Sequence, residues 1–192
     1  MEYPWLNGNF EINLHSPIPP KPKENWNVAF VETGTESKTQ RRLFLSKDHI
    51  TSDRFMVTYG DGVANINIAE LIRVHEKLRE EKNVLGTITV YNPKTRFGVV
   101  DLENSLVRGF QEKPFEDRHI SVGFMIFEKE VFDFMDDADV MLEESLLPKL
   151  AQQGKIGFYH HTSFWACMDT YGDYLHLNEL WRTQQPWKIW SD

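Results

Sequence analysis

The chain has almost no cysteine and no long apolar run, and these absences exclude two large classes of protein. Cys167 is the only cysteine among 192 residues, so an internal disulfide framework is excluded and a reducing cytoplasm is indicated. No stretch reaches the roughly 18 apolar residues that a membrane helix requires. The start, Met1-Glu2-Tyr3-Pro4-Trp5, has neither the basic nor the apolar region of a signal peptide. We therefore expect a cytoplasmic protein with no membrane partner.

An excess of positive charge is also lacking. The chain carries 21 Lys and Arg against 29 Asp and Glu, which gives a formal net charge of −8. A nucleic-acid backbone needs a basic face, so we expect no nucleic-acid partner. Phosphorylated small molecules are still compatible with this charge, because one lysine or a metal ion can outweigh it locally. The G-x-G-x-x-G, G-x-x-x-x-G-K-[ST] and G-x-S-x-G motifs are absent from the sequence, and none of the functions they indicate is supported.

The residues that are present indicate a packed globular protein. Hydrophobic residues make up 41% of the chain and aromatic residues 13%, enough for a sizeable core. Residues 1–27 are expected to form an irregular segment, because four prolines interrupt any helix or central strand there: Pro17, Pro19, Pro20 and Pro22. Residues 28–192 are expected to form a single α/β domain.

Hydrophobic periodicity predicts strands and helices in alternation. Strands are expected at residues 28–31, 55–58, 86–91, 98–102, 106–111, 121–127, 156–160 and 164–168. Helices are expected at residues 68–82, 130–136, 142–153 and 170–183, while 43–45 fits either a strand or the first turn of a helix. The order strand 55–58, helix 68–82, strand 86–91 predicts a parallel βαβ unit.

Two carboxylates follow apolar runs that read as strands. Asp61 lies in Tyr59-Gly60-Asp61-Gly62, and Asp169 ends the run that begins at Phe164. Ligands bind at the carboxyl ends of strands in open α/β sheets. A Mg²⁺ ion bound to substrate phosphates takes one or two protein carboxylates. The pair is therefore a candidate metal site; two unrelated turn aspartates are the alternative, because Asp is common in turns.

Other candidate residues also lie at strand ends. Glu112-Lys113-Pro114 places a cation that suits a phosphate monoester beside a carboxylate that suits sugar hydroxyls, although a solvated ion pair would leave the same pattern. Gly98 and Gly123 offer close backbone approach to a ligand, or else an ordinary loop glycine and a β-bulge. Cys167 lies among bulky apolar residues, which favours an inert core thiol.

Taken in order, these segments resemble the sugar-phosphate nucleotidylyltransferase family, and within it most closely the glucose-1-phosphate cytidylyltransferase branch. The resemblance runs from about Trp26 to Trp190 and rests on the following segments: Tyr59-Gly60-Asp61-Gly62, Arg96-Phe97-Gly98, Phe110-Gln111-Glu112-Lys113-Pro114, Gly123-Phe124, Leu142-Glu143 and Phe164-Trp165-Ala166-Cys167-Met168-Asp169-Thr170. The ordered set is far more specific than any of its single motifs.

The resemblance implies a Rossmann-like fold with a mixed, mostly parallel sheet flanked by helices. It also implies transfer of a cytidylyl group from CTP to α-D-glucose 1-phosphate, which gives CDP-glucose and pyrophosphate in nucleotide-sugar biosynthesis. Asp61 and Asp169 would hold Mg²⁺, and Lys113 would grip the sugar phosphate. The residues that would bind the substrates are Gly60, Gly62, Gly98, Glu112 and Gly123.

The chain departs from the family pattern at its amino-terminal end. The family begins with a strand and a glycine-rich loop, G-G-x-G-[ST]-R-L, that wraps the nucleotide phosphates, and this sequence contains no such loop. We therefore expect a fold truncated at the amino terminus, impaired as an enzyme on its own. It would be completed by a separate chain that supplies the loop, or assembled as a homo-oligomer. The alternative is a non-catalytic sugar-phosphate-binding or assembly paralogue of the same family.

Overall fold

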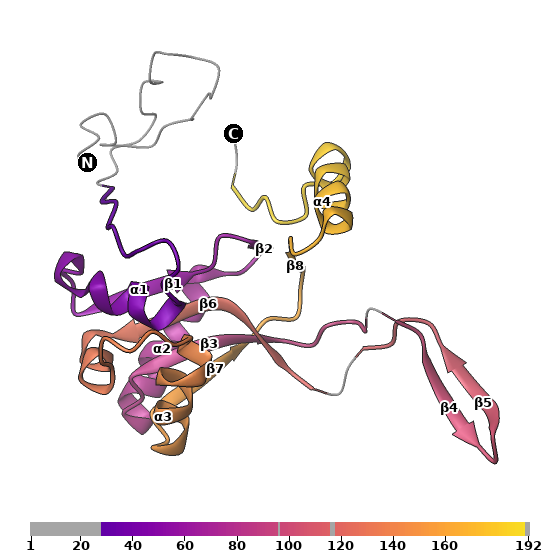
Figure 1. The fold of residues 1–192 in the computed structure, drawn as a ribbon, viewed down its shortest axis with the longest axis horizontal. Helices are drawn as coiled ribbons and strands as arrows, with labels where there is room; N and C mark the ends of the chain where they lie inside the picture. The colour runs from indigo at the N-terminus through magenta and orange to yellow at the C-terminus, as the bar shows by residue number, and fades with distance from the viewer. Residues whose placement is uncertain (1–27, 96, 116–117, 191–192) are drawn as a thin grey trace.

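The computed structural model describes residues 28–95, 97–115 and 118–190 (Figure 1). The segment 1–27, expected to be irregular, lies outside the described residues. No helix in the described part of the chain has both the length and the apolarity needed to cross a bilayer.

The body of the molecule is a four-stranded mixed sheet. Its strands, in spatial order, are β1 (Arg54–Thr58), β6 (Ile120–Glu128), β3 (Gly86–Tyr91) and β7 (Ile156–His160). Strand β6 is antiparallel to both of its neighbours, and β7 is parallel to β3. Three of the four strands therefore point one way, which confirms a mixed sheet.

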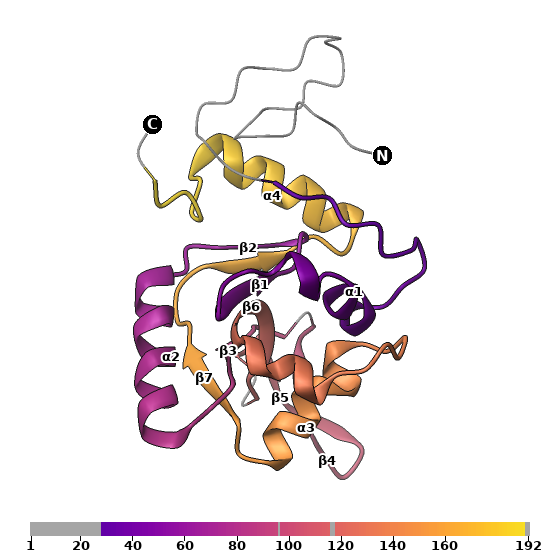
Figure 2. The same cartoon turned by 90° about the vertical axis from the view of Figure 1, so that its left-hand side faces the viewer.

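Helical segments cover both faces of this sheet (Figure 2). They are α1 (Thr39–Leu45), α2 (Ile68–Lys82), α3 (Leu146–Gln152), and three 3₁₀ turns at Lys47–His49, Lys129–Phe134 and Leu142–Glu144. Strand β6 alternates between the two sides, because successive side chains of a strand point to opposite faces. Met125 and Phe127 pack against Leu146 and Leu150 of α3, whereas Ile126 packs against Leu71 of α2.

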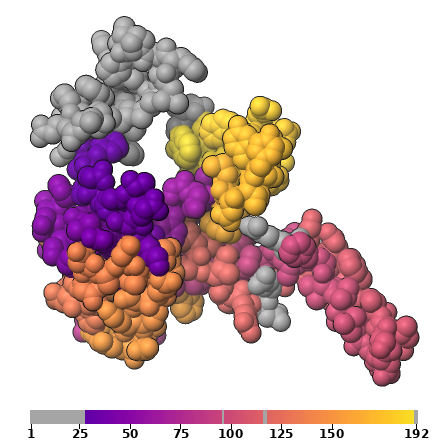
Figure 3. Space-filling view, viewed as in Figure 1, coloured from indigo at the N-terminus to yellow at the C-terminus, as the bar shows by residue number. Residues whose placement is uncertain are grey.

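Two strand pairs and helix α4 lie outside the four-stranded sheet. Strands β2 (Gly62–Ala64) and β8 (Trp165–Cys167) pair as a short antiparallel ribbon, which leads into α4 (Tyr171–Thr183). Strands β4 (Val99–Glu103) and β5 (Leu106–Gln111) form a hairpin that projects from the body as an arm (Figures 1 and 3). We call residues 99–111 the arm.

Most of the predicted elements are confirmed. The structure gives α2, β3, β5 and β7 the bounds that the periodicity predicts, and residues 43–45 are helical. The strand expected at 28–31 is wrong, because those residues form no strand. Strands β1 and β3 run in parallel, as the βαβ prediction requires, but the antiparallel β6 lies between them.

The helix predicted over 142–153 is also wrong in part, since the chain breaks it at Ser145. Pro148 explains the break. Proline has no N–H to donate to the carbonyl of Glu144, so a helix running through both residues would lose a bond there. When α3 begins at Leu146, Pro148 falls in the first turn, where no such bond is needed.

Candidate functional site

The β2–β8 ribbon brings Asp61 and Asp169, the two candidate metal-binding residues, close together in space. Gly62 pairs with Cys167, and the Met168 N–H donates a 2.9 Å hydrogen bond to the Asp61 carbonyl. Asp61 precedes β2 and Asp169 follows β8, so both lie at the same end of this ribbon. Both residues are exposed.

Their side chains nevertheless line different pockets. Asp61 lines a small pocket of about 240 Å³ together with Met168 and Trp187, and Asp169 lines one of about 740 Å³ with Cys167. Residues directly opposite each other in an antiparallel pair share a face, and the next residue points the other way. Asp61 is opposite Met168, which accounts for Asp169 turning to the other side. Among the described residues, no group of three or more His, Cys, Asp or Glu side chains comes together as a metal cluster.

The larger pocket collects side chains from three separate parts of the chain. Its polar and aromatic lining includes Thr95, Trp165, Cys167, Asp169, Asp173 and His176. The Trp165 Nε1 atom is buried and has no hydrogen-bond partner among the described residues. An unpaired buried N–H is costly unless a ligand or water accepts from it. The atom has almost no accessible surface and lies 3.6 Å from the position of a Cβ on Gly62, so it is enclosed at the β2–β8 ribbon and does not open into the pocket.

The amino-terminal end of α4 holds Asp169 in place. The Thr170 side chain accepts from the Asp173 N–H, and Asp173 Oδ2 accepts from Thr170 N at 2.9 Å in a reciprocal capping box. The same carboxylate oxygen accepts from the Asp169 N–H at 3.2 Å. Cys167 Sγ donates to Asp169 Oδ2 at 3.1 Å. Cys167 is half-buried at the pocket wall, so the expectation of a core thiol is wrong.

The root of the arm carries three of the predicted residues, of which Gly98 lines this pocket and Glu112 and Lys113 do not. Gly98 lines the pocket, and a Cβ added to it would lie 2.4 Å from Phe110. Lys113 has a φ of 47°, and its Nζ lies 3.5 Å from Glu112 Oε1 in an exposed ion pair. The next residue, Pro114, accepts from the N–H of Thr95 at 2.8 Å, and Thr95 lines the pocket.

The remaining predicted glycines have different surroundings. Gly123 has a φ of +77°, and a Cβ there would lie 2.7 Å from the ring of Tyr59. A Cβ on Gly62 would lie 3.6 Å from Trp165 Nε1, whereas Gly60 faces open space beside Asp61. Gly123 is therefore required by backbone conformation and by Tyr59, apart from any ligand.

Sequence reasoning assigned no role to the pair formed by Tyr59 and Glu143. The Tyr59 hydroxyl donates a 2.5 Å hydrogen bond to Glu143 Oε1 across 84 positions of sequence. Burial, followed by this hydrogen bond to the carboxylate, raises the pKa of Tyr59 well above its usual value. Both residues stand in the segments that carry the family resemblance, and that was the only signal for them. His176 was missed too; its one signal was its place a helical turn after Asp173.

The sequence is similar to those of known proteins. Residues 13–187 match the family model described as nucleotidyl transferase. A Bacillus subtilis protein named probable glucose-1-phosphate cytidylyltransferase is 37% identical over 87% of this chain and 65% of its own length. A Salmonella typhi glucose-1-phosphate cytidylyltransferase is 39% identical over 88% of this chain and 65% of its own. The chain thus spans just under two thirds of these curated relatives.

The fold is also that of a solved enzyme. The crystal structure of a UDP-glucose pyrophosphorylase in complex with UDP-glucose superimposes with a TM-score of 0.56 at 12% identity. The superposition covers 82% of this chain and 67% of the other. At this identity the likeness establishes the shared architecture, the Rossmann-like mixed sheet flanked by helices.

Proposed function

Since the chain belongs to the nucleotidyl transferase family, we propose that it transfers a cytidylyl group from CTP to α-D-glucose 1-phosphate. The products are CDP-glucose and pyrophosphate. One observation carries the proposal: Gly98 and Asp169, which are 71 positions apart in the sequence, line one pocket of about 740 Å³. The relatives at 37% and 39% identity support the choice of substrates. A cytoplasmic location belongs to the same proposal and is supported by the single cysteine.

Nucleotidyl transferases of this family typically use a divalent metal ion, and we assign that ion as Mg²⁺. Asp61 and Asp169 are the residues that would hold it. Both carboxylates are exposed at one end of the β2–β8 ribbon, and Mg²⁺ takes one or two protein oxygens, with phosphate and water for the rest. Because the two side chains line different pockets, one of them would have to turn for both to hold the same ion. When bound, the ion would neutralise charge on the phosphates.

In the proposed reaction, a phosphate oxygen of glucose 1-phosphate attacks the α-phosphorus of CTP. The bond from that phosphorus to the bridging oxygen breaks, and the electron pair leaves with pyrophosphate. The protein's contribution is positioning and electrostatic stabilisation. Lys113 would hold the sugar phosphate as a compact point charge. Glu112 would accept from sugar hydroxyls, with Gly98 and Gly123 against the hexose and Gly60 and Gly62 in the nucleotide-facing turn.

The test is pyrophosphate release by the purified chain with CTP, glucose 1-phosphate and Mg²⁺. Asp169→Asn keeps the shape of the side chain and removes its charge, so kcat is expected to fall by about 10²-fold or more. Asp133→Asn is the matched control, because Asp133 is an exposed carboxylate that lines a different pocket from Asp61 and Asp169, and the variant should leave kcat unchanged. Equal rates for the two variants would contradict the role of Asp169.

One observation favours a second candidate, a sugar-phosphate-binding paralogue without catalysis. Asp61 and Asp169 line different pockets, so the pocket lined by Asp169 could bind a sugar phosphate without any contact from Asp61. Calorimetric titration with glucose 1-phosphate separates the candidates. Binding without CTP, together with no pyrophosphate release from a folded chain, would favour the paralogue. Pyrophosphate release that is lost in Asp169→Asn would favour the transferase.

A further inference from the structure

Tyr59 is a packed residue that directly precedes the Gly60–Asp61 turn. It follows β1, and its ring packs against the core cluster that includes Met125 and Phe127. Its hydroxyl donates a 2.5 Å hydrogen bond to Glu143 Oε1. Hydrogen bonds to a carboxylate are roughly twice as strong as those between neutral groups. The side chain is therefore held at both ends, by the core at its ring and by Glu143 at its hydroxyl.

Strand β6 makes room for the Tyr59 ring at Gly123. The register of β3 and β6 shifts between Ile88 and Val90, where β6 advances four positions, from 121 to 125, while β3 advances two. Such a bulge re-aims the strand locally. Gly123 lies within it at a φ of +77°, and a Cβ on Gly123 would lie 2.7 Å from the Tyr59 ring. A side chain at position 123 would therefore displace the ring.

Glu143 is a fixed acceptor, because the turn that carries it is bonded to α1. The 3₁₀ turn Leu142–Glu144 buries the side chain of Leu142. The Leu142 N–H donates to Thr39 Oγ1 at 2.9 Å. The backbone next to Glu143 is thus anchored, so the hydrogen bond between the two side chains restrains Tyr59.

Beyond Tyr59, the turn has little packing of its own. Gly60 and Asp61 are exposed, and a Cβ on Gly60 would meet no heavy atom within 4 Å apart from its chain neighbours. Further along, the Asp61 carbonyl accepts from the Met168 N–H at 2.9 Å. The path of the backbone through Asp61 is therefore set by Tyr59 on one side and by Met168 on the other.

Tyr59 keeps its proton, so its contribution is geometric. Burial, followed by the hydrogen bond to Glu143 and the charge of Glu143, raises the pKa of Tyr59 well above its usual value. The charge of Asp61 adds to this rise, which places the Asp61 carboxylate within electrostatic reach of the phenol. A phenol in this state is neither an acid nor a base for a reaction near neutral pH.

We propose that Tyr59 is a positioning residue for Asp61, and that Gly123 and Glu143 act through it. Gly123 receives the ring, Glu143 fixes the hydroxyl, and the backbone from which the Asp61 carboxylate extends is held as a result. The part of this inference that concerns the ion rests on the proposed function, in which Asp61 holds a divalent metal. Replacing a residue that holds a metal ligand in place typically lowers metal affinity or activity by about 10- to 100-fold.

Amide hydrogen exchange at Met168 tests the restraint without any need for activity. Tyr59→Phe keeps the ring and removes only the hydroxyl, so the Gly60–Asp61 turn should open more often and the Met168 amide should exchange about tenfold faster. Tyr159→Phe is the matched control, because it removes the same group from β7, where Tyr159 packs on the Ile126 side of the sheet. The Met168 amide of this control should exchange as in the wild type. Unchanged exchange in Tyr59→Phe, or equal acceleration in both variants, would overturn the proposal.

The Mg²⁺ dependence of pyrophosphate release tests the consequence for the ion. In Tyr59→Phe, the Mg²⁺ concentration that gives the half-maximal rate should rise about tenfold, while the KM for glucose 1-phosphate stays unchanged. A purely structural role would lower Tm and leave the half-saturating Mg²⁺ concentration unchanged. Glu143→Ala should behave as Tyr59→Phe does, whereas Glu143→Gln keeps an acceptor and should stay near the wild type. Combining Glu143→Ala with Tyr59→Phe should add little, because both remove the same hydrogen bond.

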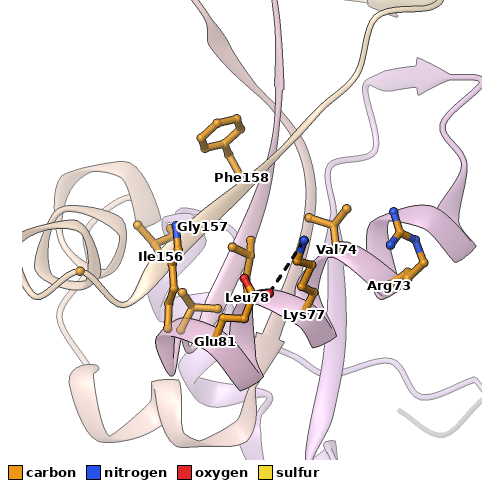
Figure 4. A pocket seen from close by; sticks show the side chains of 11 residues that line it. Arg73, Val74, Lys77, Leu78, Glu81, Ile156, Gly157 and Phe158 are labelled. Carbon is orange, nitrogen blue, oxygen red and sulfur yellow. Dashed lines mark ion pairs between the residues drawn. The ribbon is translucent and has the colours of Figure 1, made fainter.

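Glu81→Ala is the control for the loss of an exposed carboxylate. Glu81 Oε1 lies 3.8 Å from Lys77 Nζ at the groove between α2 and β7 (Figure 4). Neither Asp61 nor Asp169 lines this groove. Glu81→Ala should therefore leave the Mg²⁺ dependence unchanged.

The two measurements separate a failure of this inference from a failure of the proposed function. If the wild type is active and Tyr59→Phe has an unaltered Mg²⁺ dependence, Tyr59 does not position Asp61 for the ion. If the wild type releases no pyrophosphate while the Met168 amide still responds to Tyr59→Phe, the proposed function is wrong and the restraint on Asp61 stands.

Discussion

At the scale of single residues, the least expected feature is an ionic network buried beneath α2. His75 and Glu128 are buried, and His75 Nε2 lies 2.9 Å from Glu128 Oε1. His75 Nδ1 lies 2.8 Å from Thr87 Oγ1. Arg54 Nε donates to the same Glu128 oxygen at 2.9 Å. Burial would raise the pKa of Glu128, but the hydrogen bonds from His75 and Arg54 outweigh it and hold that pKa below its usual value.

Removing Glu128 should cost far more than removing a neighbouring carboxylate. Glu128→Ala leaves the Arg54 charge and His75 without their shared acceptor, and breaking a buried pair costs about 3 kcal/mol of unfolding free energy. Glu130→Ala is the control, since the Arg79–Glu130 pair is partly exposed and such pairs contribute about 0–1 kcal/mol. Urea denaturation of both variants gives the comparison. Equal losses would mean that the network is not a stabilising feature.

The same network predicts how stability depends on pH. Burial lowers the pKa of His75 in the folded protein, against the opposing effect of its hydrogen bond to Glu128. In the unfolded chain the pKa of a histidine is about 6.5. Below that pH the unfolded state binds a proton that the folded state does not, so this contribution to stability is lost as the pH falls. The urea midpoint should drop between pH 7.5 and pH 5.5, and it should drop by less in His75→Gln, which keeps the other six histidines.

At the scale of elements, α4 depends on its cap more than on packing. None of its residues is buried, so it lacks the apolar contacts that usually stabilise a helix. Its capping box at Thr170 and Asp173 also fixes the Asp169 backbone. By contrast, α2 has an Asn67 cap and buries Leu71 and His75. Removing the N-cap should therefore destabilise α4 more than α2.

Thr170→Ala should destabilise α4 and should also slow the proposed reaction. Losing an N-cap costs about 1 kcal/mol, a large share of the local stability of an exposed helix, and it frees the chain segment that carries Asp169. Amide hydrogen exchange should accelerate across Tyr171–Thr183, with a lower rate of pyrophosphate release. The comparison is Asn67→Ala, which removes a cap of similar strength from a packed helix. If the α4 amides of Thr170→Ala are as well protected from hydrogen exchange as those of the wild type, the prediction is wrong.

The elements also show what a sequence can reveal. Helix α2 was predicted to the residue because a single apolar stripe defines it, and the structure adds the Asn67 cap at its start. The order of strands was not predictable in the same way. The insertion of β6 between β1 and β3 depends on long-range pairing, such as that of Thr58 with Phe124 across 66 positions, which no local pattern encodes. The sequence predicted that Asp61 and Asp169 lie at strand ends. That their side chains line separate pockets follows from the register of the β2–β8 ribbon.

At the scale of the whole molecule, the arm divides the chain into a packed body and an uncovered hairpin. The sheet has its core on both faces, around Phe127 on one side and Ile126 on the other. The arm has no core of its own, because every residue of β4 is exposed. Its root nevertheless carries Gly98 and Lys113, two residues proposed to bind the sugar phosphate. Movement of the arm would therefore also move the pocket wall that carries Gly98.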